Sequence, residues 1–331
     1  MIDLGTLLSN GVSQLIGPSA IFFALLALGL NIHFGYTGLL NFGQIGFALV
    51  GGYGMGIAVA TFGLPLWAGV LVGMASGVVL ALLLGIPTLR LRTDYLAIVT
   101  IAAAEILRLI TRSVSQTDFT GGTQGLTGFG DTYAAANPFV EQSYSFLGLT
   151  FLRNDLWAII VGWTVVILCT FLTFLLARSP WGRVLKAIRE DEDAARALGK
   201  NVFAYKMQAL ALGGVFGALG GIVYALATQS LTPDFFSPAQ TFFAYAALIL
   251  GGAGRVLGPV IGAMIFWFLL SITDGFLRQA TRGTEPLITF IDSQDVGAIR
   301  FVLVGLFLGL LMVFRPQGIF GRRQEVALDA R

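Results

Sequence analysis

The residues that could do chemistry are few, and they gather in two glycine-rich stretches. The first reads NIHFGYTGLLNFGQIGFALVGGYGMG from Asn31 to Gly56, and the second runs from Thr241 to Pro259. Interrupted helix at membrane depth is tolerated only where it is buried in protein or lines a wet cavity. Paired interrupted segments in the two halves of a chain are typical of a translocation site. The path residues that this pattern predicts are Asn31, Tyr36, Thr37, Asn41, Gln44, Gly251, Gly252 and Arg255.

Both stretches also have plainer interpretations. Residues 34–44 could form a short cytoplasmic turn, and generic helix packing explains most glycines at small-x-x-x-small spacing. The string GAGRVLG lacks a preceding strand pattern, so we do not interpret it as a nucleotide loop. His33 is the only histidine and Cys169 the only cysteine, which leaves no multi-ligand metal site and no internal disulfide. We interpret both as packed side chains.

A carboxylate inside the fourth apolar run is a further path candidate. Glu105 would be costly to hold in lipid, which makes an acidic group there a functional candidate by default. Its natural partner is Arg108, one helical turn later, and Arg112 lies on the same side. The alternative is that the pair extends outward to the membrane interface.

The most charged stretch reads SPWGRVLKAIREDEDAARALGKN from Ser179 to Asn201. Ser179 followed by Pro180 predicts a helix start, and Gly199 predicts its end, so we expect one helix over about 180–199. Its apolar stripe consists of Leu185, Ile188, Ala195 and Leu198. Its acidic residues argue against a purely membrane-surface role. The pattern favours docking of a partner protein, with a solvated connector as the alternative.

The elements that position these residues must be membrane helices. Only 11% of the 331 residues are charged and 56% are hydrophobic, whereas soluble domains carry roughly 25% charged residues. We therefore predict an all-α polytopic membrane helical bundle of about 8 to 9 transmembrane segments, forming one domain over 1–331. The expected spans are 13–33, 44–62, 66–86, 95–112, 156–177, 206–228, a short one at 241–253, 256–274 and 298–314.

Positive residues predict the orientation, because they favour cytoplasmic loops. They are concentrated in the segment 178–206 and in the tail, and Arg90 and Arg92 mark a third cytoplasmic loop. The loops at about 113–155 and 275–297 are then external. Nine crossings put the N-terminus outside and the C-terminus in the cytoplasm. No basic n-region precedes the first apolar run, so we expect no cleaved signal peptide.

Several ordered blocks resemble the LivM-type permeases of branched-chain amino acid ABC transporters. They include LGLNIHFGYTGLLNFGQIGF, LRLRTDYLAIVTIAAAEILRL, TGGTQGLTG, TPDFFSP, LILGGAGRVLGPVIGA and FRPQGIFG, together with the charged stretch. The resemblance implies that this stretch is a coupling helix fitting an ATP-binding subunit. The residues that take this role by resemblance are Gly182, Arg183, Ala187, Arg189, Glu190, Asp191, Ala194, Ala195, Leu198 and Gly199. One departure is Gln44, where many relatives have histidine.

The resemblance also implies the partners. The chain has no G-x-x-x-x-G-K-[ST] loop, so ATP and Mg²⁺ are expected on two separate cytoplasmic ATPase subunits and no cofactor on this chain. A LivH-type permease, an external solute-binding protein and the lipid of a bacterial inner membrane complete the expected assembly, without nucleic acid. The expected solute is a branched-chain or related hydrophobic amino acid, and a urea or short-amide permease of the same family stays open.

Composition alone leaves two other classes to weigh. An ion-coupled secondary transporter also uses broken helices, but it would carry more buried ionisable groups than Glu105. A membrane-embedded enzyme would need a nucleophile with a base, a metal cluster or a cofactor domain, and the sequence offers none of these patterns. We therefore predict a transport permease without catalytic residues.

Overall fold

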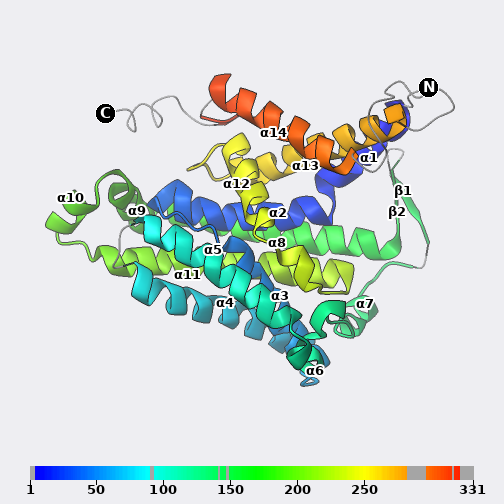
Figure 1. Cartoon of the computed structure of the whole chain (residues 1–331), viewed down its shortest axis with the longest axis horizontal. Helices are drawn as coiled ribbons and strands as arrows, with labels where there is room; N and C mark the ends of the chain where they lie inside the picture. The colour runs from blue at the N-terminus through cyan, green and yellow to red at the C-terminus, as the bar shows by residue number, and fades with distance from the viewer. Residues whose placement is uncertain are drawn as a thin grey trace.

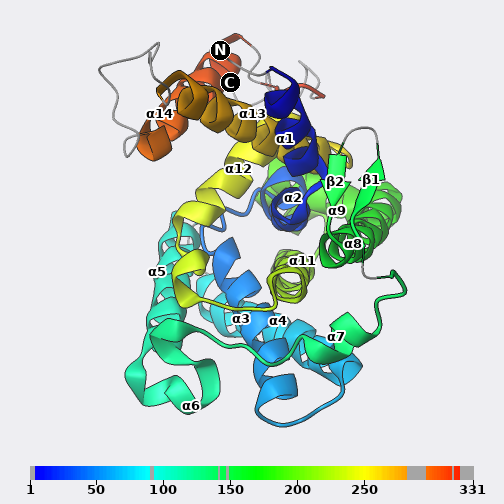
Figure 2. The same ribbon diagram turned by 90° about the vertical axis from the view of Figure 1, so that its right-hand side faces the viewer.

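The computed structural model describes residues 4–89, 93–140, 142–146, 149–281, 296–314 and 317–320. Most of these residues are helical, and Figures 1 and 2 show the long helices packed side by side around a central pair, α2 and α11. The membrane-type helices are α2 (Pro18–Leu30, continued by the π-helix η1, Asn31–Tyr36), α3 (Gln44–Ala60), α4 (Leu66–Thr88), α5 (Thr93–Arg112), α8 (Arg153–Arg178), α11 (Val202–Thr228), α12 (Ala239–Gly251), α13 (Gly258–Thr281) and α14 (Val296–Phe314).

The predicted polytopic bundle is confirmed, since each of the nine expected spans is a helix. Within the described residues, five helices are long and apolar enough to cross a membrane. Two boundaries differ from expectation. Residues before the Gly17–Pro18 joint form a separate helix, α1 (Leu4–Ile16), that packs on α13. Helix α13 continues to Thr281, into the expected loop at 275–297.

Several orientation signals lie outside the described residues. They are Arg90, Arg92, the tail arginines and the loop residues 282–295. The connection between α5 and α8 is described except for residues 141, 147 and 148. Between α5 and α8 lie η2 (Val114–Gln116), α6 (Thr117–Thr120), η3 (Gly122–Gln124), α7 (Asp131–Ala135) and the antiparallel strands β1 (Tyr144–Phe146) and β2 (Leu149–Phe151). This small hairpin is a local exception to the all-α expectation.

Helix α2 forms the centre of the bundle. Its sequence from Ala20 to Leu30 is apolar on every side, and each of these residues is buried. A helix without a polar face is typically enclosed by other helices, and here α11, α13, α12 and α8 surround it. The neighbours approach closely where they carry glycine: Gly220 faces Leu26 and Gly162 faces Ile21.

The small-x-x-x-small pattern is confirmed as a packing device in three helices. Gly73 on α4 lies against the carbonyl of Gly51, and a Cβ atom at Gly221 on α11 would collide with the backbone of Ala48. Gly262 meets α12 in the same way. In α14, by contrast, Gly305 and Gly309 face open space. Glycine contacts therefore hold α4 and α11 against α3, and separately hold α13 against α12.

Two breaks interrupt the helical backbone. The first break (residues 37–43) lies between η1 and α3, and the second break (residues 252–257) lies between α12 and α13. Residues 317–320 form a turn whose backbone covers the end of α12. Ile319 N donates to the Leu250 carbonyl at 2.9 Å and Phe320 N to the Gly251 carbonyl at 3.2 Å. These bonds satisfy two carbonyls that a helix end leaves without partners.

The charged stretch forms two helices rather than the expected one. Helix α9 (Pro180–Glu190) and α10 (Glu192–Ala197) meet at Asp191, whose backbone is extended (φ −154°, ψ 106°). Its carboxylate accepts a 2.9 Å hydrogen bond from Ala194 N, so Asp191 is the N-cap of the second helix. Ser179 caps α9, as predicted, and Gly199 (φ +76°) follows the end of α10. We call α9 and α10 the docking helices.

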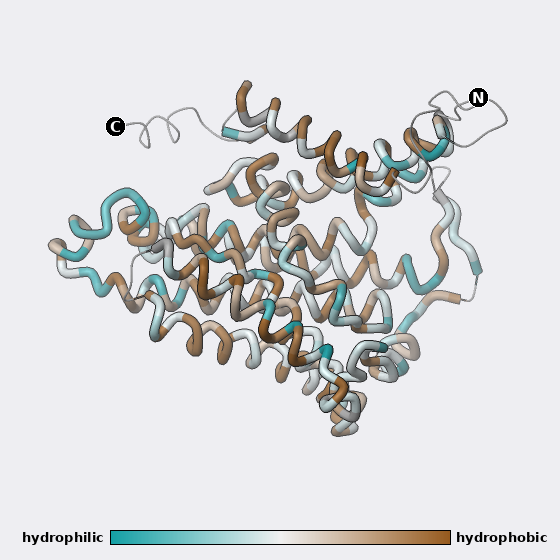
Figure 3. The backbone as a smooth tube through the Cα atoms, in the orientation of Figure 1, coloured by the Kyte–Doolittle hydropathy of each residue, from teal (hydrophilic) through white to brown (hydrophobic). Residues whose placement is uncertain are grey.

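Polar segments gather at two ends of the molecule. Figure 3 shows hydrophilic backbone at the docking helices and again around α7 and the hairpin, with apolar helices between them. The short 3-10 helix η4 (Pro233–Phe236) connects α11 to α12. In Figure 1, α1 begins at the end of the molecule opposite the docking helices.

Candidate functional site

The first break lies in the core, where its backbone is held by side chains from other helices. The Tyr245 hydroxyl on α12 accepts from Asn41 N at 3.2 Å and donates to the Asn41 carbonyl at 3.1 Å. The Thr100 hydroxyl on α5 accepts from Phe42 N at 3.1 Å. Ile45 N, just beyond the break, donates to the Thr241 hydroxyl at 3.1 Å. Unwound backbone at membrane depth thus obtains the partners that lipid cannot provide.

A buried polar chain runs beside this break. Asn41 Nδ2 lies 3.1 Å from His33 Nδ1 and donates to Gln44 Oε1 at 3.0 Å. Gln44 Nε2 donates to the Gly213 carbonyl at 2.9 Å, and His33 Nε2 lies 3.1 Å from the Leu210 carbonyl. These contacts match a neutral imidazole that accepts at Nδ1 and donates from Nε2. His33 is therefore packed, as expected, and the chain ties the break to α11.

Asn31, the first residue of η1, connects that helix to the second break. Its Nδ2 donates to the Arg255 carbonyl at 2.7 Å, and its Oδ1 accepts from Gly254 N at 2.8 Å. Both groups belong to the second break, and Asn31 itself is fully buried. The interrupted segments that the sequence predicts in separate halves of the chain are thus in direct contact.

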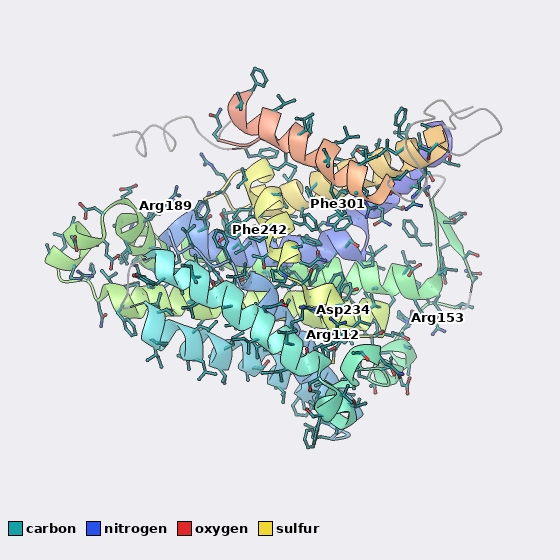
Figure 4. All side chains as sticks on the ribbon, in the orientation of Figure 1. Arg112, Arg153, Arg189, Asp234, Phe242 and Phe301 are labelled. Atoms are coloured by element: carbon teal, nitrogen blue, oxygen red, sulfur yellow. The ribbon has the colours of Figure 1, made fainter. Side chains whose placement is uncertain are left out.

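The docking helices reach this junction through Arg189. Its Nη1 donates to the Gly35 carbonyl in η1 at 2.6 Å. A Cβ atom at Gly38 would lie 3.3 Å from Arg189 Cγ, and one at Gly254 would lie 3.5 Å from its Nη1. Lys186 adds a second contact, with its ammonium 5.7 Å from the centre of the Tyr36 ring. One face of α9 therefore touches both breaks, and Figure 4 labels Arg189 at that end of the bundle.

The other face of the docking helices is open. The predicted coupling residues exposed on it are Arg183, Ala187, Glu190, Asp191, Ala194, Leu198 and Gly199. Arg189 is also exposed, although it belongs to the face that touches the breaks. Leu198 is 79% exposed, which is high for a large apolar side chain. Gly182 and Ala195 are buried, and Gly182 packs against the backbone at the end of α8. Gly182 and Ala195 therefore contribute to packing within the protein, whereas the exposed residues are available to contact a partner protein.

Glu105 lies apart from this junction, in a group of charges at the far end of α5. Arg108 donates to both oxygens of Glu105, at 2.6 and 2.9 Å, which confirms the expected pair. Arg108 Nη1 also donates to Asp234 Oδ1 in η4 at 3.1 Å, and Arg112 Nη1 lies 3.4 Å from the same oxygen. Arg112 thus pairs with Asp234 and not with Glu105. We call Glu105, Arg108, Arg112 and Asp234 the ion-pair cluster.

The predicted path residues therefore fall into two groups, one around the two breaks and the other consisting of Glu105 in the ion-pair cluster. Asn31, Tyr36, Thr37, Asn41, Gln44, Gly251 and Gly252 are buried in the described chain, around the two breaks. The sequence interpretation did not single out Thr100, Thr241, Tyr245 or Asp234 as partners. A lone hydroxyl inside an apolar run was the available signal for the first three.

Comparison with known proteins gives one family match. Residues 16–315 match the family model described as branched-chain amino acid transport system / permease component. The chain is 30% identical over 314 residues to the high-affinity branched-chain amino acid transport system permease protein LivM of Escherichia coli K12, covering 92% of this chain and 69% of that protein. It is 24% identical over 335 residues to the probable LivM permease of Methanocaldococcus jannaschii, covering 90% of each. The solved structure of PsaBC from Streptococcus pneumoniae in complex with Fab aligns at 17% identity and a TM-score of 0.43, covering 93% of this chain and 92% of that one.

Proposed function

The chain belongs to the branched-chain amino acid transport system permease family, and from this membership we propose that it carries branched-chain or related hydrophobic amino acids into the cell. It is an integral inner-membrane protein and a permease subunit of the ABC transporter class. The name of the Escherichia coli relative supports the proposed solute. A neutral or zwitterionic solute also suits a bundle in which few charges lie between the helix ends.

We propose that the assembly contains a second, LivH-type permease, two cytoplasmic ATPase subunits and an external solute-binding protein. The exposed surface of the docking helices supports an ATPase partner. It combines an apolar knob, Leu198, with charges of both signs, and interfaces are built from such apolar centres with polar rims. The docking helices are then cytoplasmic. The N-terminus is external in this orientation, because α1 begins at the opposite end (Figure 1).

The single observation that carries the coupling mechanism is the hydrogen bond from Arg189 to the Gly35 carbonyl. Closure of the ATPase subunits on ATP would displace α9, and Arg189 would pass that displacement to η1 and the second break. Asn31 joins η1 to the second break, so these two segments would move together. In the described state Asn31 holds the two interrupted segments in contact, and we propose that their separation opens the path.

The test replaces Arg189 in the complete importer. R189A removes the guanidinium donor, and we expect L-leucine uptake by proteoliposomes to fall about tenfold, as when one charge-assisted hydrogen bond is lost. ATPase subunits should still co-purify, and ATP hydrolysis should continue without matching uptake. The control is K200A, since Lys200 is exposed beside the docking helices and lies outside the predicted coupling set. Equal uptake by the two variants would refute the link.

The docking surface itself is tested by charge reversal at Glu190. E190K changes an exposed side chain, whereas a change at Asp191 would also remove the cap of α10. We expect E190K to weaken co-purification of the ATPase subunits and to leave membrane insertion unchanged. Normal co-purification and normal ATPase stimulation in this variant would argue against docking at this surface.

A further inference from the structure

The ion-pair cluster stands on an otherwise apolar side of the molecule. Its four side chains are 14% (Arg108), 35% (Glu105), 46% (Arg112) and 60% (Asp234) exposed. On the same helix, Ile106 and Leu109 are 57% and 50% exposed. Figure 2 shows α5 and α12 on one side of the bundle, and Figure 4 labels Asp234 and Arg112 close together.

Contact between this charged surface and lipid acyl chains would be energetically unfavourable. Ionised side chains at membrane depth are expensive to expose to acyl chains, and they normally face a water-filled cavity or other protein. Arg108 is held from two directions, by Glu105 and by Asp234, so the centre of the cluster is a fixed frame. Its outer members, Arg112 and Asp234, keep much of their surface open. The side carrying the cluster therefore faces water or protein in the assembled importer.

We propose that the ion-pair cluster lines the outer part of the solute passage and recognises the paired charges of a zwitterionic amino acid. The proposal rests on the proposed function and names the groups that recognise the solute. Arg112 offers a guanidinium to the α-carboxylate, and Asp234 offers a carboxylate to the α-ammonium. The neighbouring Ile106 and Leu109 provide an apolar wall for a hydrophobic side chain.

The geometry favours exchange with the solute at these two residues. At 3.4 Å, the Arg112–Asp234 contact is longer than the contacts that Arg108 makes within the cluster, and it is the most exposed. Exposed ion pairs of this kind contribute little stability, so a ligand that supplies both charges can replace them at small cost. The Arg108–Glu105 pair stays intact during this exchange and keeps Asp234 in position.

The first experiment asks whether the cluster is wet in the assembled importer. The only native cysteine, Cys169, is 5% exposed, so the background of labelling is low. We expect R112C to react with a membrane-impermeant methanethiosulfonate reagent applied from outside, and L-leucine with its binding protein to slow that reaction. The matched control is I167C on α8, where the native side chain is 64% exposed on an apolar helix face; it should not react. An unreactive R112C would overturn the proposal in favour of a contact with the second permease.

The second experiment measures transport and ATP hydrolysis together. In proteoliposomes at saturating loaded binding protein, we expect D234N to lower the turnover of L-leucine uptake about tenfold and D234E to restore most of it. Stimulation of ATPase activity by the binding protein should persist, so more ATP is consumed per leucine. D131N, a change at an exposed aspartate on α7 outside the cluster, should behave like the wild type.

The outcomes separate the alternatives. Loss of ATPase stimulation in D234N would overturn the proposal, because it would show that the cluster docks the binding protein. Unchanged uptake in D234N would also overturn it. If the wild-type importer failed to carry L-leucine at all, the proposed function would fall instead, and labelling of R112C would still report whether this side faces a passage.

Discussion

At the scale of single residues, the unusual feature is that several side chains form hydrogen bonds to one stretch of non-helical backbone. Residues 37–43 lie among apolar helices, where an unpaired N–H or C=O group is costly. Hydroxyl groups of Thr100 on α5 and Tyr245 on α12 provide partners within this stretch, and Thr241 provides one for Ile45 N just beyond it. A segment that is fixed in this way can change its conformation only when those helices move.

Tyr245 makes two of these bonds, so its hydroxyl should matter for stability. We expect Y245F to lower the free energy of unfolding by about 1–3 kcal/mol, because the backbone N–H and the backbone carbonyl of Asn41 both lose a buried partner. Thermal unfolding of the purified protein in detergent measures the change. Y95F is the control, since Tyr95 is 54% exposed on α5. Identical unfolding temperatures for the two variants would contradict this account.

At the scale of elements, the bundle depends on glycine-lined contacts between helices and on one bend in the docking helices. Asp191 separates α9 from α10, so α9 can face the two breaks while α10 turns outward. Glu192 is fixed in this arrangement by Arg196 at 2.9 Å and by Lys206 on α11. Motion of the docking helices would therefore reach α11 as well as η1.

The contact between α3 and α11 gives a direct test of the packing. G221A adds a methyl group against the backbone of Ala48, and neither backbone can yield as a flexible side chain would. We expect a loss of about 1–3 kcal/mol in stability, visible as a lower unfolding temperature and a lower yield of folded protein. G309A adds the same group where α14 faces open space and should be neutral in the isolated subunit. Equal losses in both would refute the packing argument.

The sequence predicted elements better than contacts. Apolar runs of about 20 residues identified each span, because lipid imposes that length. The helix α1 was missed because polar residues, among them Asn10 and Gln14, interrupt its sequence, so it forms no apolar run of spanning length. The bend at Asp191 was missed because its capping bond competes locally with the helix ladder. The Arg189–Gly35 bond joins positions 154 residues apart, and no spacing rule within one sequence reports such a pair.

At the scale of the whole molecule, polar segments occupy two opposite ends, and the helices between them are apolar (Figure 3). The docking helices form one end, and α7 with the hairpin forms the other. This separation is the arrangement expected when two aqueous compartments face the same protein. The predicted orientation assigns the first end to the cytoplasm.

Sidedness can be measured with two single cysteines. In right-side-out vesicles, we expect an impermeant thiol reagent to label T132C on α7 and to leave K200C unlabelled until the membrane is opened. Both native side chains are exposed in the described chain, so access depends on the compartment alone. The reverse pattern would place the docking helices outside and would exclude ATPase binding there.

The turn at residues 317–320 seals the end of α12 with two backbone hydrogen bonds. A ribosome releases these residues only after nearly all of the bundle has been made and inserted. The carbonyls of Leu250 and Gly251 therefore acquire these two hydrogen bonds only at a late step of synthesis and folding. A chain that ends before residue 319 cannot form either bond, so its α12 would lack this backbone cover.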